Sequence, residues 1–147
     1  MNRFDFKKII EAAGDAIIAA DQDGNIVLWN PAAERIFGFP AQEALGRSLD
    51  LIIPERYRDR HWTGFRAVMA SGQSRYGSEL LRVPAVHRSG ASLSIAFTVA
   101  LVKTAEGRVE GIAAIVRDET ARWNEERELR RRINELERQI KKSDNAD

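Results

Sequence analysis

The chain has 147 residues, 44% of them hydrophobic, and a formal net charge of +1 at pH 7. This length predicts one domain with a helical extension, and the balanced charge gives no electrostatic reason to expect nucleic-acid binding. No apolar run approaches the roughly 20 residues of a membrane span, and the first ten residues lack the apolar core of a signal peptide, so we expect a cytoplasmic protein. The absence of cysteine excludes disulfides, thiolate metal sites and flavin chemistry through a cysteine adduct.

Residues 4–13 predict a short helix, because the apolar side chains of Phe6, Ile9 and Ile10 recur at helical spacing. A helix this short does not persist alone in water and must pack on another surface. We therefore interpret residues 1–13 as a capping segment. It would pack either on the sheet of its own chain or on a second subunit.

The next segment predicts a hairpin followed by a sharply started helix. Two short apolar runs flank residues 21–25, whose glycine and asparagine tolerate the positive φ of a tight turn. Asn30 and Pro31 then supply the N-cap and the first position of a helix, which Gly38 ends. Residues 40–45 predict a second short helix.

A longer helix is predicted over residues 54–71, closed by the glycine that follows. Along it, Tyr57, His61, Phe65 and Val68 recur at helical spacing and share one face. His61 therefore projects from an apolar stripe toward the protein interior.

Three strands are predicted after this helix, over residues 75–86, 91–102 and 109–117. The middle strand alternates strictly and places its large apolar side chains on one face, namely Leu93, Ile95, Phe97, Val99 and Leu101. Its other face carries small side chains, which the N-terminal helix or a partner subunit could approach closely. With the hairpin, this makes a five-stranded antiparallel sheet with helices inserted between strands 2 and 3, an α+β fold.

Three motifs in this order resemble the PAS family of sensor domains. They are D-x-D-G-x-I-x-x-W-N-P-A-A-E-R-I-F-G-F at residues 21–39, G-R-S-L-D-L-I-I-P-E-R at residues 46–56 and R-D-E-T at residues 117–120. The resemblance implies a PAS domain over residues 14–119, with a ligand-sized pocket on the helical side of the sheet. The residues expected to line that pocket are Tyr57, Phe65, Leu81, Ile95 and Phe97.

The resemblance also implies a role for the last of these motifs. In the family, its aspartate and threonine, here Asp118 and Thr120, fix the angle of a helix that carries signal outward. Glu119 stands between them where an aliphatic residue is usual. The packing contact of that aliphatic residue is therefore not expected here.

The run P-E-R-Y-R-D-R-H, residues 54–61, resembles the haem-binding PAS oxygen sensors, in which a histidine at this place is the axial ligand. A neutral imidazole on an apolar stripe suits that bond, so haem b with His61 as metal ligand is one hypothesis. Those sensors use an arginine at the position of Leu81 to hold bound gas, and Arg82 is expected to point to the other face. The alternative is a structural His61, and the sequence leaves the cofactor unknown.

Residues 120–147 predict a charged helix with a heptad seam. Ile133 and Ile140 fall at position a, and Leu129 and Leu136 fall at position d, which favours two parallel strands and hence a homodimer. The charges at positions g and e would pair Glu125 with Arg130, and Arg132 with Glu137, across the dimer. The alternative is a solvated single helix with the internal pairs Glu126–Arg130 and Glu137–Lys141.

The sequence shows no nucleophile elbow, zinc helix or phosphate loop, so we do not expect an enzyme. The first hypothesis is a sensory module that binds a small ligand or cofactor and signals through a dimeric C-terminal helix to a partner protein or a fused output domain. The second is a ligand-free dimerisation or interaction module. Nucleic-acid binding would rest on the basic run 130–132, whose helix also carries several glutamates.

Overall fold

The computed structural model describes residues 3–74 and 77–146. The helices are α1 (Phe6–Ala12), α2 (Pro31–Phe37), α3 (Ala41–Ala44), α4 (Arg58–Ser71) and α5 (Thr120–Asn145), with short 3-10 helices η1 (Leu49–Ile52) and η2 (Glu55–Tyr57). The strands are β1 (Ala16–Asp21), β2 (Ile26–Trp29), β3 (Leu81–Val86), β4 (Ser92–Lys103) and β5 (Val109–Asp118).

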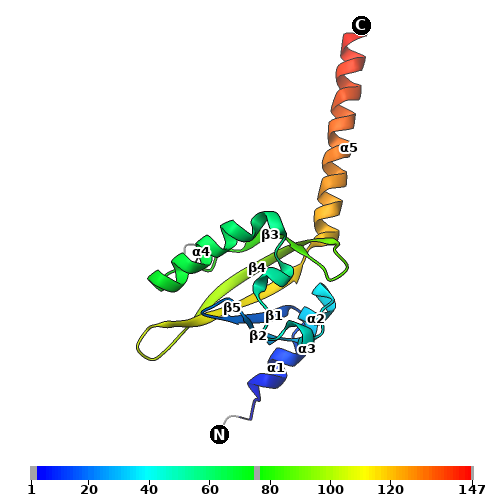
Figure 1. Cartoon of the computed structure of the whole chain (residues 1–147). Coiled ribbons are helices and arrows are strands. Elements are labelled where there is room, and N and C mark those ends of the chain that lie inside the picture. Colours follow the sequence, from blue (N-terminus) through cyan, green and yellow to red (C-terminus); the bar gives the residue numbers. More distant parts are fainter. Residues whose placement is uncertain (1–2, 75–76, 147) are drawn as a thin grey trace.

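The five strands form one antiparallel sheet in the order β2-β1-β5-β4-β3. The helices between β2 and β3 follow the first hairpin, and α4 crosses one face of the sheet (Figure 1). α5 extends away from the domain as a single rod, while α1 lies at the opposite end (Figure 1). The predicted α+β fold with helices inserted between strands 2 and 3 is confirmed.

The β1–β2 turn forms where the sequence predicts it, and of its glycine and asparagine only the glycine has a positive φ. The Asp21 carboxylate accepts hydrogen bonds from the amides of Asp23 and Asn25, both at 3.0 Å, and Gly24 adopts a φ of 80°. Because only glycine takes this conformation without strain, the turn depends on Gly24.

Asn30 caps α2 and also joins three segments of the chain. Its Oδ1 accepts from the amides of Ala33 at 3.0 Å and Ile17 at 2.9 Å. Its Nδ2 donates to the carbonyls of Ile10 at 2.9 Å and Asp15 at 3.1 Å. The side chain is buried, with all its hydrogen-bonding capacity in use. A residue predicted only as a helix cap therefore also holds α1 and β1 in place.

The hydrophobic core lies between the inward face of the sheet and the helices after β2. Ile18, Ile95 and Val116 come from three adjacent strands and pack in one cluster with Phe37 of α2 and Phe65 of α4. Each of these side chains is at most 8% exposed. Burial of side chains of this size is worth about 1.5–3 kcal/mol each, so this cluster fixes α4 over the sheet.

Two element starts differ from the sequence prediction by several residues. The third strand begins at Leu81 and not at residue 75; residues 77–80 form a turn and irregular chain, and residues 75–76 lie outside the described residues. The helix predicted over 54–71 begins with the 3-10 helix η2 before α4 starts at Arg58. Tyr57 at that junction makes no side-chain cap, so nothing in the local sequence marked the change of helix type.

The small-residue face of β4 is not covered by the N-terminal helix. α1 contacts α2 and buries none of its residues, and it lies away from β4 (Figure 1). On the same outward face, Ile115 of the neighbouring strand is 52% exposed. The N-terminal helix therefore does not cover this face of β4, and its coverage by a partner subunit stays a prediction.

Candidate functional site

His61 sits on α4 within a cluster of three aromatic rings. Its ring centroid lies 4.7 Å from that of Trp62 and 6.0 Å from that of Phe65. Trp62 and Phe65 also meet edge to face, with centroids 5.1 Å apart. The predicted projection of His61 from an apolar stripe agrees with these contacts.

The environment of His61 favours the neutral imidazole. Burial lowers the pKa of His61 below its ordinary value of 6.5, and the nearby carboxylate of Asp50 only partly opposes this. The Nδ1 atom is buried and has no hydrogen-bond partner among the described residues. A buried polar atom without a partner is costly, and on a neutral ring such a nitrogen can bind a metal or a ligand group.

Trp62 holds this part of α4 against the rest of the domain. Its Nε1 donates a hydrogen bond of 2.7 Å to Oδ1 of Asp50 in η1. Its indole ring lies directly on Gly24, where an added Cβ would overlap the ring. Trp62 therefore ties α4 to both η1 and the β1–β2 turn, next to His61.

An open hollow of about 470 Å³ lies between the β1–β2 turn and α4. The residues that line it are Gln22, Asp23, Asn25, Ser48, Trp62, Phe65 and Arg66. Trp62 and Phe65 thus face this hollow and also contact the His61 ring. The two rings therefore link the surroundings of His61 to this hollow.

The structure brings some of the expected pocket residues together. Phe65, Ile95 and Phe97 belong to one apolar cluster. Leu81 pairs with Phe97 across the β3–β4 ladder and is partly buried, as is Tyr57 just before α4. Tyr57 and Leu81 are not part of that cluster, and of the five residues only Phe65 lines the hollow beside α4. The role of the five residues as ligand contacts stays a prediction.

The residues around His61 suit haem in donor chemistry more than they suit a free metal ion. Among the described residues, no group of three or more histidine, cysteine, aspartate or glutamate side chains converges on one point. A free ion would need several such ligands, whereas haem needs one axial imidazole, because its porphyrin supplies the other bonds. A porphyrin at His61 would require the rings of Trp62 or Phe65 to move aside.

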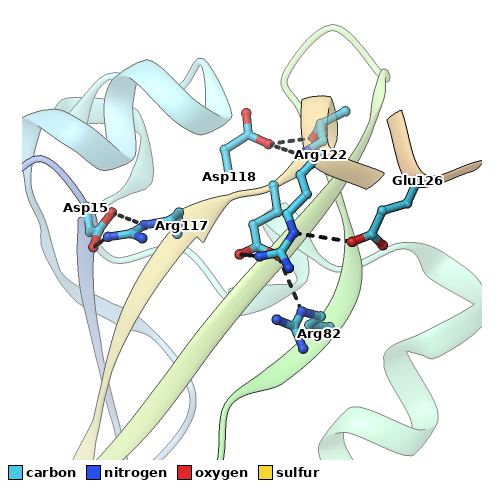
Figure 2. Close-up of polar contacts among 8 residues, drawn as sticks. Asp15, Arg82, Arg117, Asp118, Arg122 and Glu126 are labelled. Carbon is cyan, nitrogen blue, oxygen red and sulfur yellow. Dashed lines mark hydrogen bonds and ion pairs between the residues drawn. The ribbon is translucent and has the colours of Figure 1, made fainter. Parts of the chain in front are cut away.

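Asp118 and Thr120 tie the start of α5 to the start of β4. The Asp118 carboxylate accepts from the Thr120 amide at 2.9 Å and from its hydroxyl at 2.5 Å. The Thr120 hydroxyl oxygen accepts from the Ser94 amide at 3.0 Å, and the Glu119 amide donates to the Ser94 carbonyl at 2.8 Å. Figure 2 shows Asp118 beside the first turn of this helix. These bonds are compatible with the junction that the motif resemblance implied, and the role of Asp118 and Thr120 in setting the helix angle stays a prediction.

Glu119 has a role that sequence reasoning missed. Its side chain is 15% exposed and lies 3.3 Å from Nε of Arg82 on β3 and 3.7 Å from Nη1 of Arg122 on α5. An ion pair therefore stands where an aliphatic contact is usual. One signal was available in the sequence, because strand alternation already placed Arg82 on the face opposite Leu81.

The residues predicted for the heptad seam form an exposed row along α5. Leu129, Ile133, Leu136 and Ile140 are 54–60% exposed, and α5 buries none of its residues within the single chain. The single-helix alternative predicted that Glu126 pairs with Arg130, but within the helix Glu126 pairs with Arg122, and Glu128 pairs with Arg131.

No described helix is long and apolar enough to cross a membrane.

Comparisons with known proteins agree with this architecture. Residues 5–118 match the PAS fold family. An uncharacterized protein of Azorhizobium caulinodans is 34% identical over 126 residues, which are 85% of this chain and 17% of that protein. The oxygen sensor protein DosP of Escherichia coli is 26% identical over 126 residues, 84% of this chain and 16% of DosP.

A solved PAS domain from Colwellia psychrerythraea superposes with a TM-score of 0.69 at 19% identity, over 79% of this chain and 95% of that one. This likeness supports the fold alone. The chain spans less than a fifth of the length of the two curated relatives.

Proposed function

The chain belongs to the PAS family, and we propose that it is a non-enzymatic sensory module in which an occupant beside His61 changes the setting of α5. The observation that carries this proposal is the pair of hydrogen bonds at Ser94, whose carbonyl accepts from the Glu119 amide and whose amide donates to the Thr120 hydroxyl oxygen. Ser94 directly precedes Ile95, which points into the core. A shift of β4 caused from inside the domain therefore acts on the first turn of α5.

An occupant can bias α5 only if it binds two arrangements of the domain with different affinity. Phe97 and Ile112 are packed against the core but are only partly buried. Side chains of this kind can move further than those of a fully packed core. Phe97 on β4 and Ile112 on β5 are therefore the side chains that an occupant would displace.

The output would pass through α5 as a parallel homodimer. The exposed row Leu129, Ile133, Leu136 and Ile140 supports this, because a stripe of isoleucine at a and leucine at d is stabilised by pairing with a second copy. The much greater length of the relatives supports a fused output domain or a signalling partner.

Haem is the occupant that His61 supports best. The neutral imidazole with an unpartnered buried nitrogen favours it, as does the similarity to a protein named as an oxygen sensor. Bound haem would supply an iron that binds small gas molecules. In this chain His61 would hold the iron, and the ring of Trp62 or Phe65 would shift from its contact with His61 to admit the porphyrin. Arg82, which pairs with Glu119, would not reach a bound gas.

The test is a visible absorption spectrum of the chain expressed with haem supplied, compared with the His61→Ala variant. An absorption band of bound haem that is lost in the variant would support the haem proposal. His87→Ala is the matched control, since this second histidine lies in the β3–β4 turn. A featureless spectrum in all three proteins would reject haem and favour the second candidate.

The second candidate is a ligand-free dimerisation module. The aromatic rings packed around His61 favour it, because they fill the space that an occupant would need. It predicts that α5 pairs but does not respond to any compound bound by the domain.

A further inference from the structure

Glu119 connects the edge strand of the sheet to the signalling helix. Arg82 lies on β3, the last strand in the sheet order, and Arg122 lies in the first turn of α5. Both guanidinium groups lie within ion-pair distance of the one Glu119 carboxylate, and Arg122 continues to Glu126 at 3.3 Å (Figure 2).

The carboxylate depends on these partners more than a surface charge would. The Glu119 side chain is only 15% exposed, whereas those of Arg82 and Arg122 are 57% and 61% exposed. A largely buried carboxylate must be paired to be tolerated. Of its two partners, only Arg82 belongs to the sheet, so of the two ion pairs only this one can hold α5 to the domain.

The backbone of Glu119 is fixed separately. Its amide donates to the Ser94 carbonyl on β4, and its carbonyl accepts from the Trp123 amide in α5. These bonds anchor the starting point of the helix but leave its direction to the side chains around the first turn. The ion pair with β3 supplies a second attachment point away from β4.

We propose that Arg82 and Glu119 form an ionic clasp that sets the direction in which α5 leaves the domain. The clasp replaces the apolar contact usual at this junction with a pair of charges, which can open without exposing a hydrophobic side chain.

Through the clasp, a movement of β3 caused by an occupant of the interior would also reach α5, in addition to the path through β4. This part rests on the proposed sensory function. Leu81 and Val83, which flank Arg82, pair with Phe97 and Ile95 of β4. Strand alternation points these flanking side chains to the face opposite Arg82. Displacement of β3 from inside would therefore move Arg82 and, through Glu119, the helix.

The test measures the direction of α5 without any ligand. Nitroxide labels are placed on Glu106→Cys in the β4–β5 turn and Arg138→Cys on α5; because the chain has no cysteine, only these sites react. Labelled protein is diluted into an excess of unlabelled protein, so that pulsed electron paramagnetic resonance reports distances within one chain. We expect a narrow distribution for the unsubstituted chain.

Arg82→Ala and Glu119→Gln should each raise the population outside the main peak on the order of two- to fivefold, and Arg82→Lys should raise it less. The double variant should be no worse than Glu119→Gln alone, because that variant already removes the pair with Arg82. Arg88→Ala is the matched control: it removes an ion pair with Glu43 elsewhere on the domain and should leave the distribution unchanged.

An Arg82→Ala distribution equal to that of Arg88→Ala would overturn the clasp, as would additive broadening in the double variant. Circular dichroism equal to that of the unsubstituted chain shows that each variant is folded, which is expected because Arg82 is exposed. If Arg82→Ala broadens the distribution but α5 responds to no occupant in any form of the protein, the clasp stands and the sensory proposal fails.

Discussion

The amide of Ser94 donates a hydrogen bond of 3.0 Å to the hydroxyl oxygen of Thr120, so that the first turn of α5 is fixed to the start of β4. The two residues are 26 positions apart in the chain. Asp118 orients the same hydroxyl by accepting its hydrogen. The direction of this bond means that the hydroxyl is used both as donor and as acceptor, which no apolar substitute can reproduce.

Thr120→Val should destabilise the domain by about 0.5–1.5 kcal/mol, because it keeps the branched shape and removes both hydrogen bonds of the hydroxyl. Chemical denaturation measures the loss of unfolding free energy. Amide exchange at Ser94 should become faster in the same variant. The control is Thr98→Val, which lies on the outward face of β4, the strand that carries Ser94. Equal losses of unfolding free energy in the two variants would argue against a special role for the Thr120 hydroxyl.

Gly24→Ala should destabilise the protein more than Gly46→Ala. Both glycines have a positive φ, 80° and 83°, which costs an alanine about 1–2 kcal/mol. Only at Gly24 would the new methyl group also meet the Trp62 ring, since nothing lies within 4 Å of a Cβ at Gly46. The difference between the two midpoints in urea isolates the Trp62 contact. Equal destabilisation would mean that Trp62 can move aside freely.

The stability of the domain should fall as the pH drops below the ordinary histidine pKa of 6.5. Because burial lowers the pKa of His61 in the folded state, the unfolded chain binds its proton first. Stability therefore falls from there until the pH reaches the lowered pKa of folded His61, below which both states carry the proton. His61→Gln should flatten this part of the stability curve, whereas His87→Gln should leave it in place. A proton NMR titration midpoint for His61 at or above 6.5 would refute the explanation.

Ile133→Asp should convert a dimer into a monomer in sedimentation equilibrium, because it places a charge at a seam position. Asn134→Asp adds the same charge one position away, outside the seam, and should leave the dimer intact. Both residues are exposed in the single chain, so neither change affects the fold of the domain. A monomer before substitution would show that α5 stands as a solvated helix.

Local signals in the sequence were sufficient for most of the fold. The turn around Gly24 and the cap at Asn30 each depend on chemistry within a few residues, and both appear in the structure as expected. The alternation of β4 is only partly reflected in burial, because Ile95 and its neighbour Ala96 on the other face are both buried. The start of β3 was predicted too early. The residues before Leu81 carry no hydrophobic alternation that would separate a strand from an extended loop.

The site was harder to predict, because its contacts join residues distant in sequence. The helical spacing of His61 showed which way it faces, but not that Trp62 would reach across to Gly24 and Asp50. The pairing of Glu119 with Arg82 spans 37 positions. Such contacts follow from strand order and register, which single-residue patterns do not contain.

The measurement that tests the central claim most directly is amide NMR of the isotope-labelled chain, with and without haemin, following Phe65 beside His61 and Trp123 in α5. The account predicts that both amide signals shift together, and that in Asp118→Ala the Phe65 shift persists while the Trp123 shift is lost. A shift at Phe65 with no change at Trp123 in the unsubstituted chain would contradict the account, because the interior would then be occupied without any effect on α5.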